Sequence, residues 1–290
     1  FGFLNRDIRR NLGGFKEDLI QLKKDPGKRN IGYIFKKFYQ FMAESQTIGH
    51  PRNEVFTFLY YAHQLGIAMF KLVANPGKEV TVRFGDTDVT AIGKENKDLH
   101  PYIFEQLFRL NQIIRDKEGY EILQGISNEL MLKIQVTVDS FDVAKIQFYK
   151  SLYEKSLRNN LLQKVLQEAD NPKYVETGFV AGNVNETIVT KERKDIIRHV
   201  QQPVFKAYKL IFENDQEGLN QFIFDYLNNY RDFIVKKDYS NDGTFWLTYG
   251  LLAALAFAHD QGMRIEAESD YIPAWLYKGE FEGLKEQMVC

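Results

Sequence analysis

The residues best suited to metal or acid–base chemistry are few and scattered in this sequence. Its five histidines are His50, His63, His100, His199 and His259. None has a second His or Cys at metal-ligand spacing, and the single cysteine, Cys290, is the last residue. A protein zinc site needs several such ligands at short, regular spacings. The sequence therefore predicts neither a metal site nor a disulfide within the chain.

Two histidines have neighbours that could suggest catalysis. His63 lies on an expected amphipathic helix, where a lone histidine is usually a structural group. His259 is followed by Asp260, but adjacent helical residues point in different directions and rarely form a working pair. Glycine-rich phosphate loops and the G-x-S-x-G nucleophile elbow do not occur. Carboxylates are numerous, yet none stand out as a glycosidase pair, so we expect no catalytic residue and no cofactor.

Acidic side chains in expected loops are better candidates for contacts with another macromolecule. Asp86 and Asp88 flank an expected turn, whereas Tyr239 and Asp242 lie in a polar loop before an apolar helix. A further acidic stretch, residues 266–270, follows that helix. Carboxylates can grip a basic protein surface by standing in for phosphates. The competing interpretation of each group is an ordinary solvated loop.

The composition is that of a globular chain with balanced charge. Hydrophobic residues make up 44%, and 38 Lys and Arg face 39 Asp and Glu, giving a formal charge of −1. This balance argues against a nucleic-acid partner bound through bulk charge. The most apolar run, Phe245–Ala258, is shorter than the roughly 20 residues that span a bilayer, so we expect a buried helix and no membrane partner. One cysteine favours the cytoplasm, although a chain that begins at Phe1 leaves a removed signal peptide open.

Apolar residues recur at helical spacing along most of the chain. Phe35, Phe38, Tyr39 and Met42 follow the i, i+3, i+4, i+7 pattern of a helix with one buried face. Similar stripes occupy residues 58–72, 103–114 and 219–233. Asp139 and Ser140 precede one long helix that we expect from about 143 to 169.

Two stretches interrupt the helical pattern. Alternating apolar residues around Gly85-Asp86 predict a short β-hairpin or extended insertion near residues 79–92. Residues 178–190, rich in Gly and Asn, predict a loop. The sequence thus predicts a mainly α fold: a multi-helix, bundle-like single body over residues 1–290. A weak subdivision near residues 136–142 is the alternative.

The last fifty residues carry the most specific pattern. An apolar helix rich in small residues ends in Asp260-Gln261-Gly262, and Ser269-Asp270-Tyr271-Ile272-Pro273 follows a short extended stretch. This pattern resembles the C-terminal signature of the immunity protein 49 family. Ile114-Arg115-Asp116 and the helix link at residues 215–220 resemble further family positions. The similarity covers most of the chain, but it is specific only at this end.

The resemblance implies a helical immunity protein of a bacterial polymorphic toxin system. Such a protein would bind a cognate toxin effector domain encoded nearby and block it by steric occlusion, without being an enzyme. We expect Asp86, Asp88, Tyr239 and Asp242 to contact the toxin. We expect structural roles for the residues that match the family signature, which are Arg115, Asp116, Gly262, Ser269, Asp270, Tyr271 and Pro273. Two other functions stay open: an enzyme that reverses the toxin's modification, and a helical adaptor unrelated to toxins.

Overall fold

A computed structural model describes residues 6, 8, 9, 14, 17, 18, 20, 21, 24, 31–94, 99–132, 138–175 and 189–288. The chain forms two compact units, each assembled from separate segments. Unit 1 comprises Phe1–Leu99, Ser240–Leu247 and Gly279–Cys290, and unit 2 comprises His100–Tyr239 and Thr248–Lys278. The chain therefore passes between the units four times. The single domain expected over residues 1–290 stays a prediction, and so does the alternative of a weak subdivision near residues 136–142, which falls within unit 2 and partly outside the described residues.

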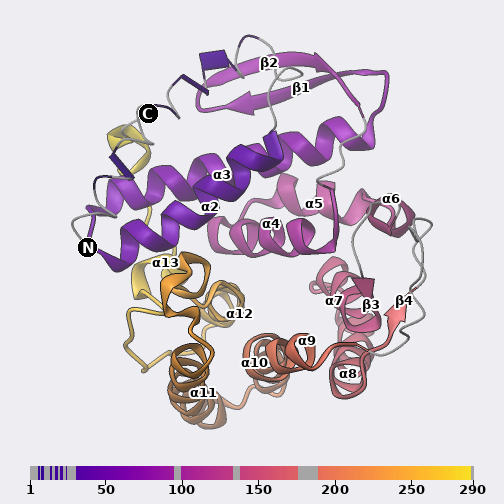
Figure 1. The fold of residues 1–290 in the computed structure, drawn as a ribbon, viewed down its shortest axis with the longest axis vertical. Helices are drawn as coiled ribbons and strands as arrows, with labels where there is room; N and C mark the ends of the chain where they lie inside the picture. The colour runs from indigo at the N-terminus through magenta and orange to yellow at the C-terminus, as the bar shows by residue number, and fades with distance from the viewer. Residues whose placement is uncertain are drawn as a thin grey trace. The chain divides into compact units, whose positions relative to one another are not determined.

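Unit 1 is a helical hairpin with a β-hairpin beside it (Figure 1). Its elements are α2 (Ile31–Thr47), α3 (Arg52–Ala74), β1 (Glu79–Phe84), β2 (Thr87–Ile92) and the short 3₁₀ helices η2 (Tyr239–Asn241, which begins in unit 2), η3 (Gly243–Phe245) and η4 (Lys285–Gln287). The apolar stripe predicted on α2 is buried, as expected for a helix packed through one face. Pro51 precedes α3, and Asn75-Pro76-Gly77 follows its end.

The predicted β-hairpin is confirmed. β1 and β2 pair antiparallel with Phe84 opposite Thr87, so the turn consists of Gly85 and Asp86 alone. Gly85 has a φ of +62°, a conformation that glycine adopts without strain and that suits two-residue hairpin turns. Val82 and Phe84 are buried on one face, while Arg83 between them is exposed. The alternation in the sequence therefore set both the pairing and the buried face.

Unit 2 is almost entirely helical in its described part. Its elements are α4 (Pro101–Ile114), α5 (Lys117–Gly125), α6 (Asn128–Leu132), β3 (Val138–Asp139), α7 (Ser140–Lys150), α8 (Lys155–Asp170), β4 (Tyr174–Val175), α9 (Lys191–Ile196), the π-helical turn η1 (Ile197–Gln201), α10 (Gln202–Phe212), α11 (Gln216–Lys236), α12 (Tyr249–Asp260) and α13 (Ala274–Lys278). The mainly α prediction is confirmed. The loop expected at residues 178–190 lies outside the described residues except for 189 and 190.

Helix α12 is the buried helix that the sequence predicted. All ten residues from Tyr249 to Ala258 are buried, and the helix contacts α4, α10 and α13. Its small side chains allow the neighbouring helices to approach closely: a Cβ placed on Gly250 would lie 2.8 Å from Val204 Cγ2. No helix in the described part of the chain combines the length and apolarity needed to cross a bilayer.

The single long helix expected from about residue 143 to 169 is wrong. Asp139 does cap the helix start, accepting a hydrogen bond from the Asp142 amide at 2.8 Å. The helix then ends at Lys150, and α8 starts only at Lys155. The carbonyl oxygen of Lys150 accepts hydrogen bonds from Tyr120 Oη at 2.7 Å and Gln124 Nε2 at 2.9 Å. These side chains belong to α5 and supply hydrogen bonds to a carbonyl at the end of α7. The break therefore has no signal in the sequence around Lys150.

Candidate functional site

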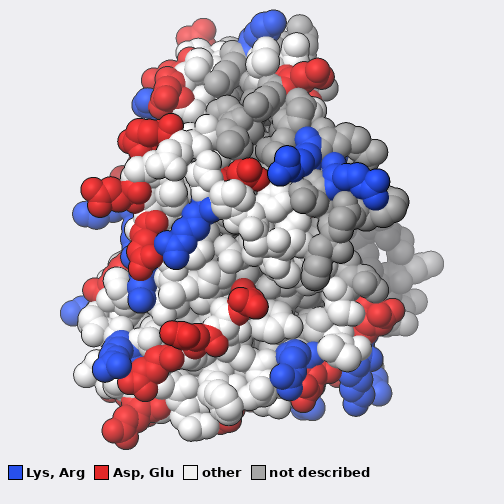
Figure 2. All heavy atoms as spheres, turned by 90° about the vertical axis from the view of Figure 1, so that its left-hand side faces the viewer, with Lys and Arg blue, Asp and Glu red and all other residues white. Residues whose placement is uncertain are grey.

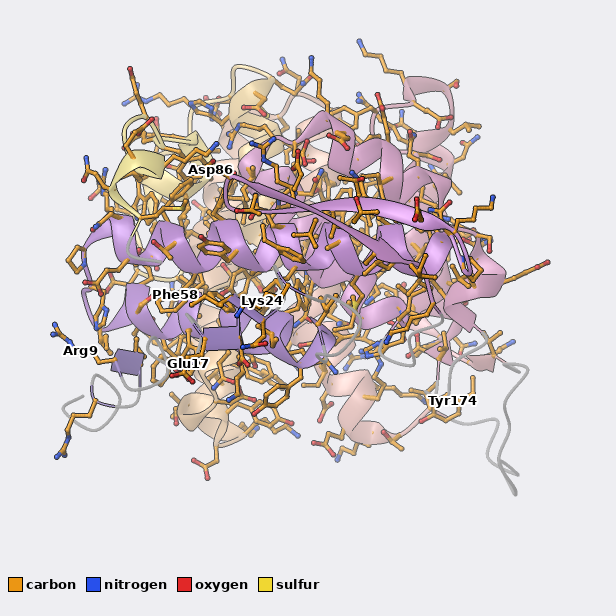
Figure 3. The ribbon with its side chains drawn as sticks, turned by 90° about the horizontal axis from the view of Figure 1, so that it is seen from above. Arg9, Glu17, Lys24, Phe58, Asp86 and Tyr174 are labelled. Carbon is orange, nitrogen blue, oxygen red and sulfur yellow. The ribbon has the colours of Figure 1, made fainter. Side chains whose placement is uncertain are left out.

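The turn of the β-hairpin holds one predicted contact residue in an anchored, exposed position. The Gly85 amide donates to Gln64 Oε1 at 2.6 Å, and Gln64 Nε2 donates to the Gly85 carbonyl at 3.4 Å. These bonds fasten the turn to α3. Figure 3 shows Asp86 at this end of the hairpin. The Asp86 side chain is 85% exposed and lies 3.9 Å from Lys285 Nζ, so its carboxylate is available to a partner.

Asp88 lies on the same hairpin, opposite Arg83. The two side chains are 3.8 Å apart at their closest charged atoms and both are largely exposed. An exposed pair of this length contributes little to stability, typically under about 1 kcal/mol. Asp86 and Asp88 therefore present two carboxylates on a short, backbone-anchored element.

The other two predicted contact residues are engaged differently. Asp242, in unit 1, accepts hydrogen bonds from the backbone amide and hydroxyl of Thr244 at 2.9 and 2.7 Å, and so caps η3. Tyr239, in unit 2, donates its hydroxyl to Glu192 Oε1 at 3.0 Å and packs its ring edge-on against Phe233. This hydrogen bond raises the pKa of Tyr239. Asp242 is exposed, whereas Tyr239 is only partly accessible.

Arg115 joins three elements of unit 2. It ends α4 in the left-handed conformation, with φ +65° and ψ +39°. Its guanidinium donates to the carbonyls of Ile113 and Tyr277 at 2.6 and 2.5 Å, and to Asp260 Oδ1 at 3.0 and 3.1 Å. Arg115 thereby ties the end of α4 to the end of α12 and to α13. His259 Nδ1 is 3.6 Å from the same Asp260 oxygen, too far for a hydrogen bond.

Two further signature residues cap helices. Asp116 begins α5, accepting a hydrogen bond from the Glu118 amide at 3.0 Å. Gly262 follows α12 with a φ of +85°, and the next amide, from Met263, reaches back to the Ala258 carbonyl at 3.0 Å. A left-handed glycine with this back-bond is a common helix ending.

Hydrogen bonds to the backbone of Tyr271 hold the Ser269–Pro273 segment in place. The Ser269 hydroxyl accepts from the Tyr271 amide at 3.2 Å, and the Tyr271 carbonyl accepts from the Thr248 amide and hydroxyl at 3.0 and 3.1 Å. Pro273 is buried directly before α13, whereas the Asp270 side chain is exposed. The segment thus connects the start of α12 with α13.

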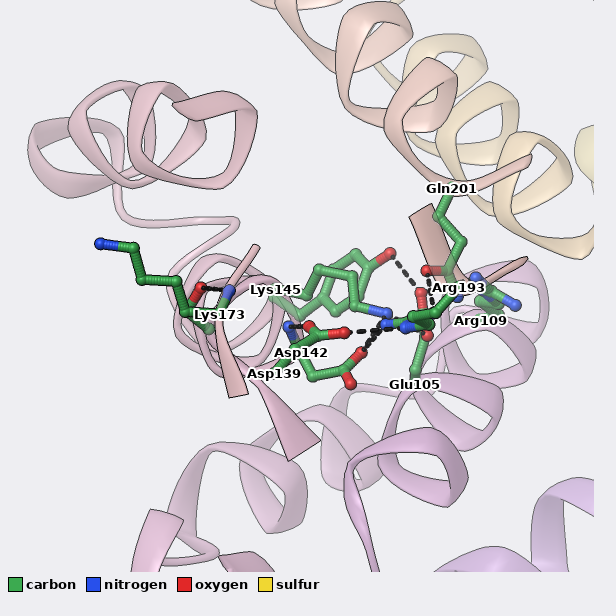
Figure 4. A network of polar contacts seen from close by, with 10 residues as sticks. Glu105, Arg109, Asp139, Asp142, Lys145, Lys173, Arg193 and Gln201 are labelled. Atoms are coloured by element: carbon green, nitrogen blue, oxygen red, sulfur yellow. Dashed lines mark hydrogen bonds and ion pairs between the residues drawn. The ribbon is translucent and has the colours of Figure 1, made fainter. Parts of the chain in front are cut away.

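Sequence reasoning missed a buried charge network in unit 2 (Figure 4). Lys145 Nζ lies 2.8 Å from Glu105 Oε2 and 2.9 Å from Asp142 Oδ1, and Glu105 and Lys145 are almost fully buried. Glu105 also pairs with Arg109 at 2.6 Å. Arg193 closes the other end of the network, at 2.8 Å from Asp139 and 2.7 Å from Asp142. Three acids and three bases from β3, α4, α7 and α9 therefore compensate one another.

The electrostatics of this network favour the ionised form of two of its three carboxylates, Glu105 and Asp142. Burial opposes ionisation of Glu105, but Arg109 and Lys145 hold its pKa below the ordinary value. Burial likewise opposes ionisation of Asp142, yet Lys145 and Arg193 lower its pKa. Burial and the neighbouring Asp142 raise the pKa of Asp139. Charges paired in this way can hold α4, α7 and α9 in position within unit 2.

The described residues offer no grouping of three or more His, Cys, Asp or Glu side chains that could hold a metal ion. Figure 2 shows acidic and basic side chains interspersed on one face of the molecule. Recognition of a partner would therefore depend on small groups of side chains, such as those at the hairpin turn, which is anchored to α3.

Comparison with known proteins adds one result. The family model described as Immunity protein 49 matches residues 46–276. That stretch is most of the chain and includes the four predicted contact residues and every signature residue. Searches of curated proteins and of solved structures gave no match.

Proposed function

The chain belongs to the immunity protein 49 family, and from this premise we propose that it binds a cognate antibacterial toxin domain and blocks it by steric occlusion. The family implies an immunity protein of a toxin system, with a toxin as partner. The match over residues 46–276 is the observation that carries the proposal. We further propose that the toxin is encoded nearby, that the complex forms in the cytoplasm, and that no chemical step is involved.

The hairpin turn supports a binding role for unit 1. A preformed surface loses little conformational entropy when it binds. The double hydrogen bond between Gly85 and Gln64 fixes the turn, and Asp86 adds an exposed charge at its end. We propose that Asp86 and Asp88 contact a basic region of the toxin, with Asp242 as a further contact. For Tyr239, in unit 2, we propose a separate contact through the exposed part of its ring, because its hydroxyl is bound to Glu192.

The function is tested by expressing the neighbouring toxin gene in a sensitive bacterium, with and without this protein, followed by co-purification. Growth rescue together with a stable complex is the expected result. Rescue without a complex would point to an enzyme that reverses the toxin's modification. Absence of both would contradict the proposal.

A matched pair of charge reversals tests the surface. Asp86→Lys should weaken the complex at least tenfold, since reversing a contact charge replaces attraction by repulsion. Glu79→Lys makes the same charge change at the far end of β1, where the side chain is also exposed. An equal effect of both variants, or of neither, would show that the hairpin turn is not the contact.

A further inference from the structure

The helix that runs from Lys191 to Phe212 is basic in a chain whose formal charge is −1. It combines α9, the π-helical turn η1 and α10, and contains six Lys and Arg but only two Asp and Glu. One of the six, Arg193, forms ion pairs with Asp139 and Asp142 within unit 2.

The two acids of this helix are both held by other residues of unit 2. Glu192 accepts the hydroxyl hydrogen bond of Tyr239, and Asp195 Oδ2 lies 2.8 Å from Lys237 Nζ. The hydrogen bond from Lys237 lowers the pKa of Asp195, and the nearby Lys191 lowers it further. Glu192 and Asp195 therefore offset part of the positive charge of this helix and of Lys237, but two acids do not balance its six bases.

Of the other five bases, Lys209 lies 3.9 Å from Glu213, and four have no salt bridge in the part of the chain that the structure describes: Lys191, Lys194, Arg198 and Lys206. Lys191, Lys194 and Arg198 are all exposed. Their i, i+3, i+7 spacing places them on one face of the helix across two successive turns. We call these three residues the basic stripe. Similar positive charges on one helix face repel each other, so the stripe has an unfavourable energy that an acidic surface would relieve.

The stripe is rigidly positioned. Thr190 caps α9 by accepting from the Arg193 amide at 3.2 Å, and the Arg193 guanidinium also donates to Gln201 Oε1 at 2.8 Å. The helix then widens into the π turn directly before Pro203, which has no amide hydrogen to donate to the preceding turn. Arg193 on the inner face therefore fixes the orientation of the bases on the outer face.

We propose that the basic stripe is a second docking surface of this protein, which binds an acidic face of the toxin domain. This inference rests on the proposed toxin-binding function and goes beyond it by predicting charge of opposite sign on two regions of the partner. A protein partner fits better than a nucleic acid, because the stripe has only one arginine and two lysines and the whole chain is slightly acidic. The exposed ring of His199 beside the stripe is already stacked on Phe233, with ring centroids 4.7 Å apart.

The test compares two triple variants of the full chain in binding to the purified toxin domain. Lys191→Gln, Lys194→Gln and Arg198→Gln together remove the stripe. Lys78→Gln, Lys94→Gln and Lys278→Gln remove the same charge from other exposed positions. We expect the stripe variant to associate roughly tenfold more slowly at low ionic strength and to lose most of the salt dependence, since steering charges act on the association rate. The control variant should stay within about twofold of the unmodified protein.

Three outcomes separate the possibilities. A toxin complex that is equally fast with the stripe variant overturns this inference and leaves the proposed function intact. If no toxin complex forms, the proposed function fails. The basic stripe is then tested separately, by comparing the binding of labelled poly-L-glutamate with the binding of a labelled 20-base-pair DNA duplex. Stripe-dependent binding of poly-L-glutamate alone supports an acidic protein partner, whereas stripe-dependent binding of the duplex, or binding of neither probe, overturns it.

Discussion

Replacing Lys145 by methionine should destabilise unit 2 by about 3–5 kcal/mol, the range found when one partner of a buried ion pair is removed. Lys145 is 3% exposed, and its ammonium lies within 3 Å of two carboxylates, those of Glu105 and Asp142. At an effective dielectric constant near 20, each contact amounts to about 6 kcal/mol of Coulomb attraction before desolvation is subtracted. Methionine keeps most of the side-chain volume, so the loss reflects charge rather than a cavity.

The two tryptophans allow this loss to be measured in unit 2 alone. The chain contains only Trp246, in unit 1, and Trp275, buried in unit 2. In a Trp246→Phe background, urea unfolding followed by fluorescence reports on the surroundings of Trp275. Lys164→Met, at an exposed position on α8, is the matched control and should change the free energy of unfolding by less than about 0.5 kcal/mol.

A double-mutant cycle distinguishes the network from simple packing. Adding Glu105→Gln to Lys145→Met removes the buried carboxylate that has lost one of its two cationic partners, so the double variant should cost about 1–3 kcal/mol less than the sum of the single variants. A single-variant cost below about 1 kcal/mol, or strict additivity, would refute the reasoning. The first result would mean that the charge of Lys145 contributes little to stability, and the second that Lys145 and Glu105 are not coupled.

Three other predictions concern stability in unit 2. Arg115→Ala should lower the free energy of unfolding in urea by about 2–3 kcal/mol, because it removes several hydrogen bonds at a left-handed position. Arg115→Lys should recover less than half of this loss, because lysine lacks the planar fork of the guanidinium. Full recovery by lysine would contradict this prediction. Gly250→Ala should cost about 1–3 kcal/mol through overpacking, and the double variant with Val204→Ala should restore most of the thermal midpoint. Because the pKa of Glu105 is lowered on folding, its contribution is present above its ordinary pKa of 4.5 and is lost as pH falls further. Glu105→Gln should therefore flatten the acid side of the stability profile, and an unchanged slope would exclude this residue as its source.

Patterns of local origin were predicted well from the sequence. The hairpin follows from alternation around Gly85-Asp86, and the buried α12 follows from an apolar run bounded by Gly262. The resemblance in the last fifty residues led to the family that the match over residues 46–276 shows. Each of these signals lies within a short stretch of chain, where spacing alone constrains the structure.

Features that depend on distant partners were not predicted. The end of α7 at Lys150 depends on side chains of α5, which lie some 26–30 residues earlier in the chain. Glu105 and Arg109 have the i, i+4 spacing of an ordinary surface pair, and only the fold places Lys145 beside them. The basic stripe was equally hidden, because the acids next to it in sequence are held by Tyr239 and Lys237. The toxin contacts expected at Asp86, Asp88, Tyr239 and Asp242 stay predictions.

The return of the chain's end to unit 1 has a consequence for protein synthesis. Phe56 on α3 packs against Phe281, and Asn53 donates to the Gln287 carbonyl at 2.9 Å. On the ribosome these early residues emerge when Phe281 and Gln287 have not yet been translated, so the contacts form only after the ribosome has passed residue 287. A chain whose synthesis stops before Phe281 would contain all of α3 and still lack the side chains that cover Phe56.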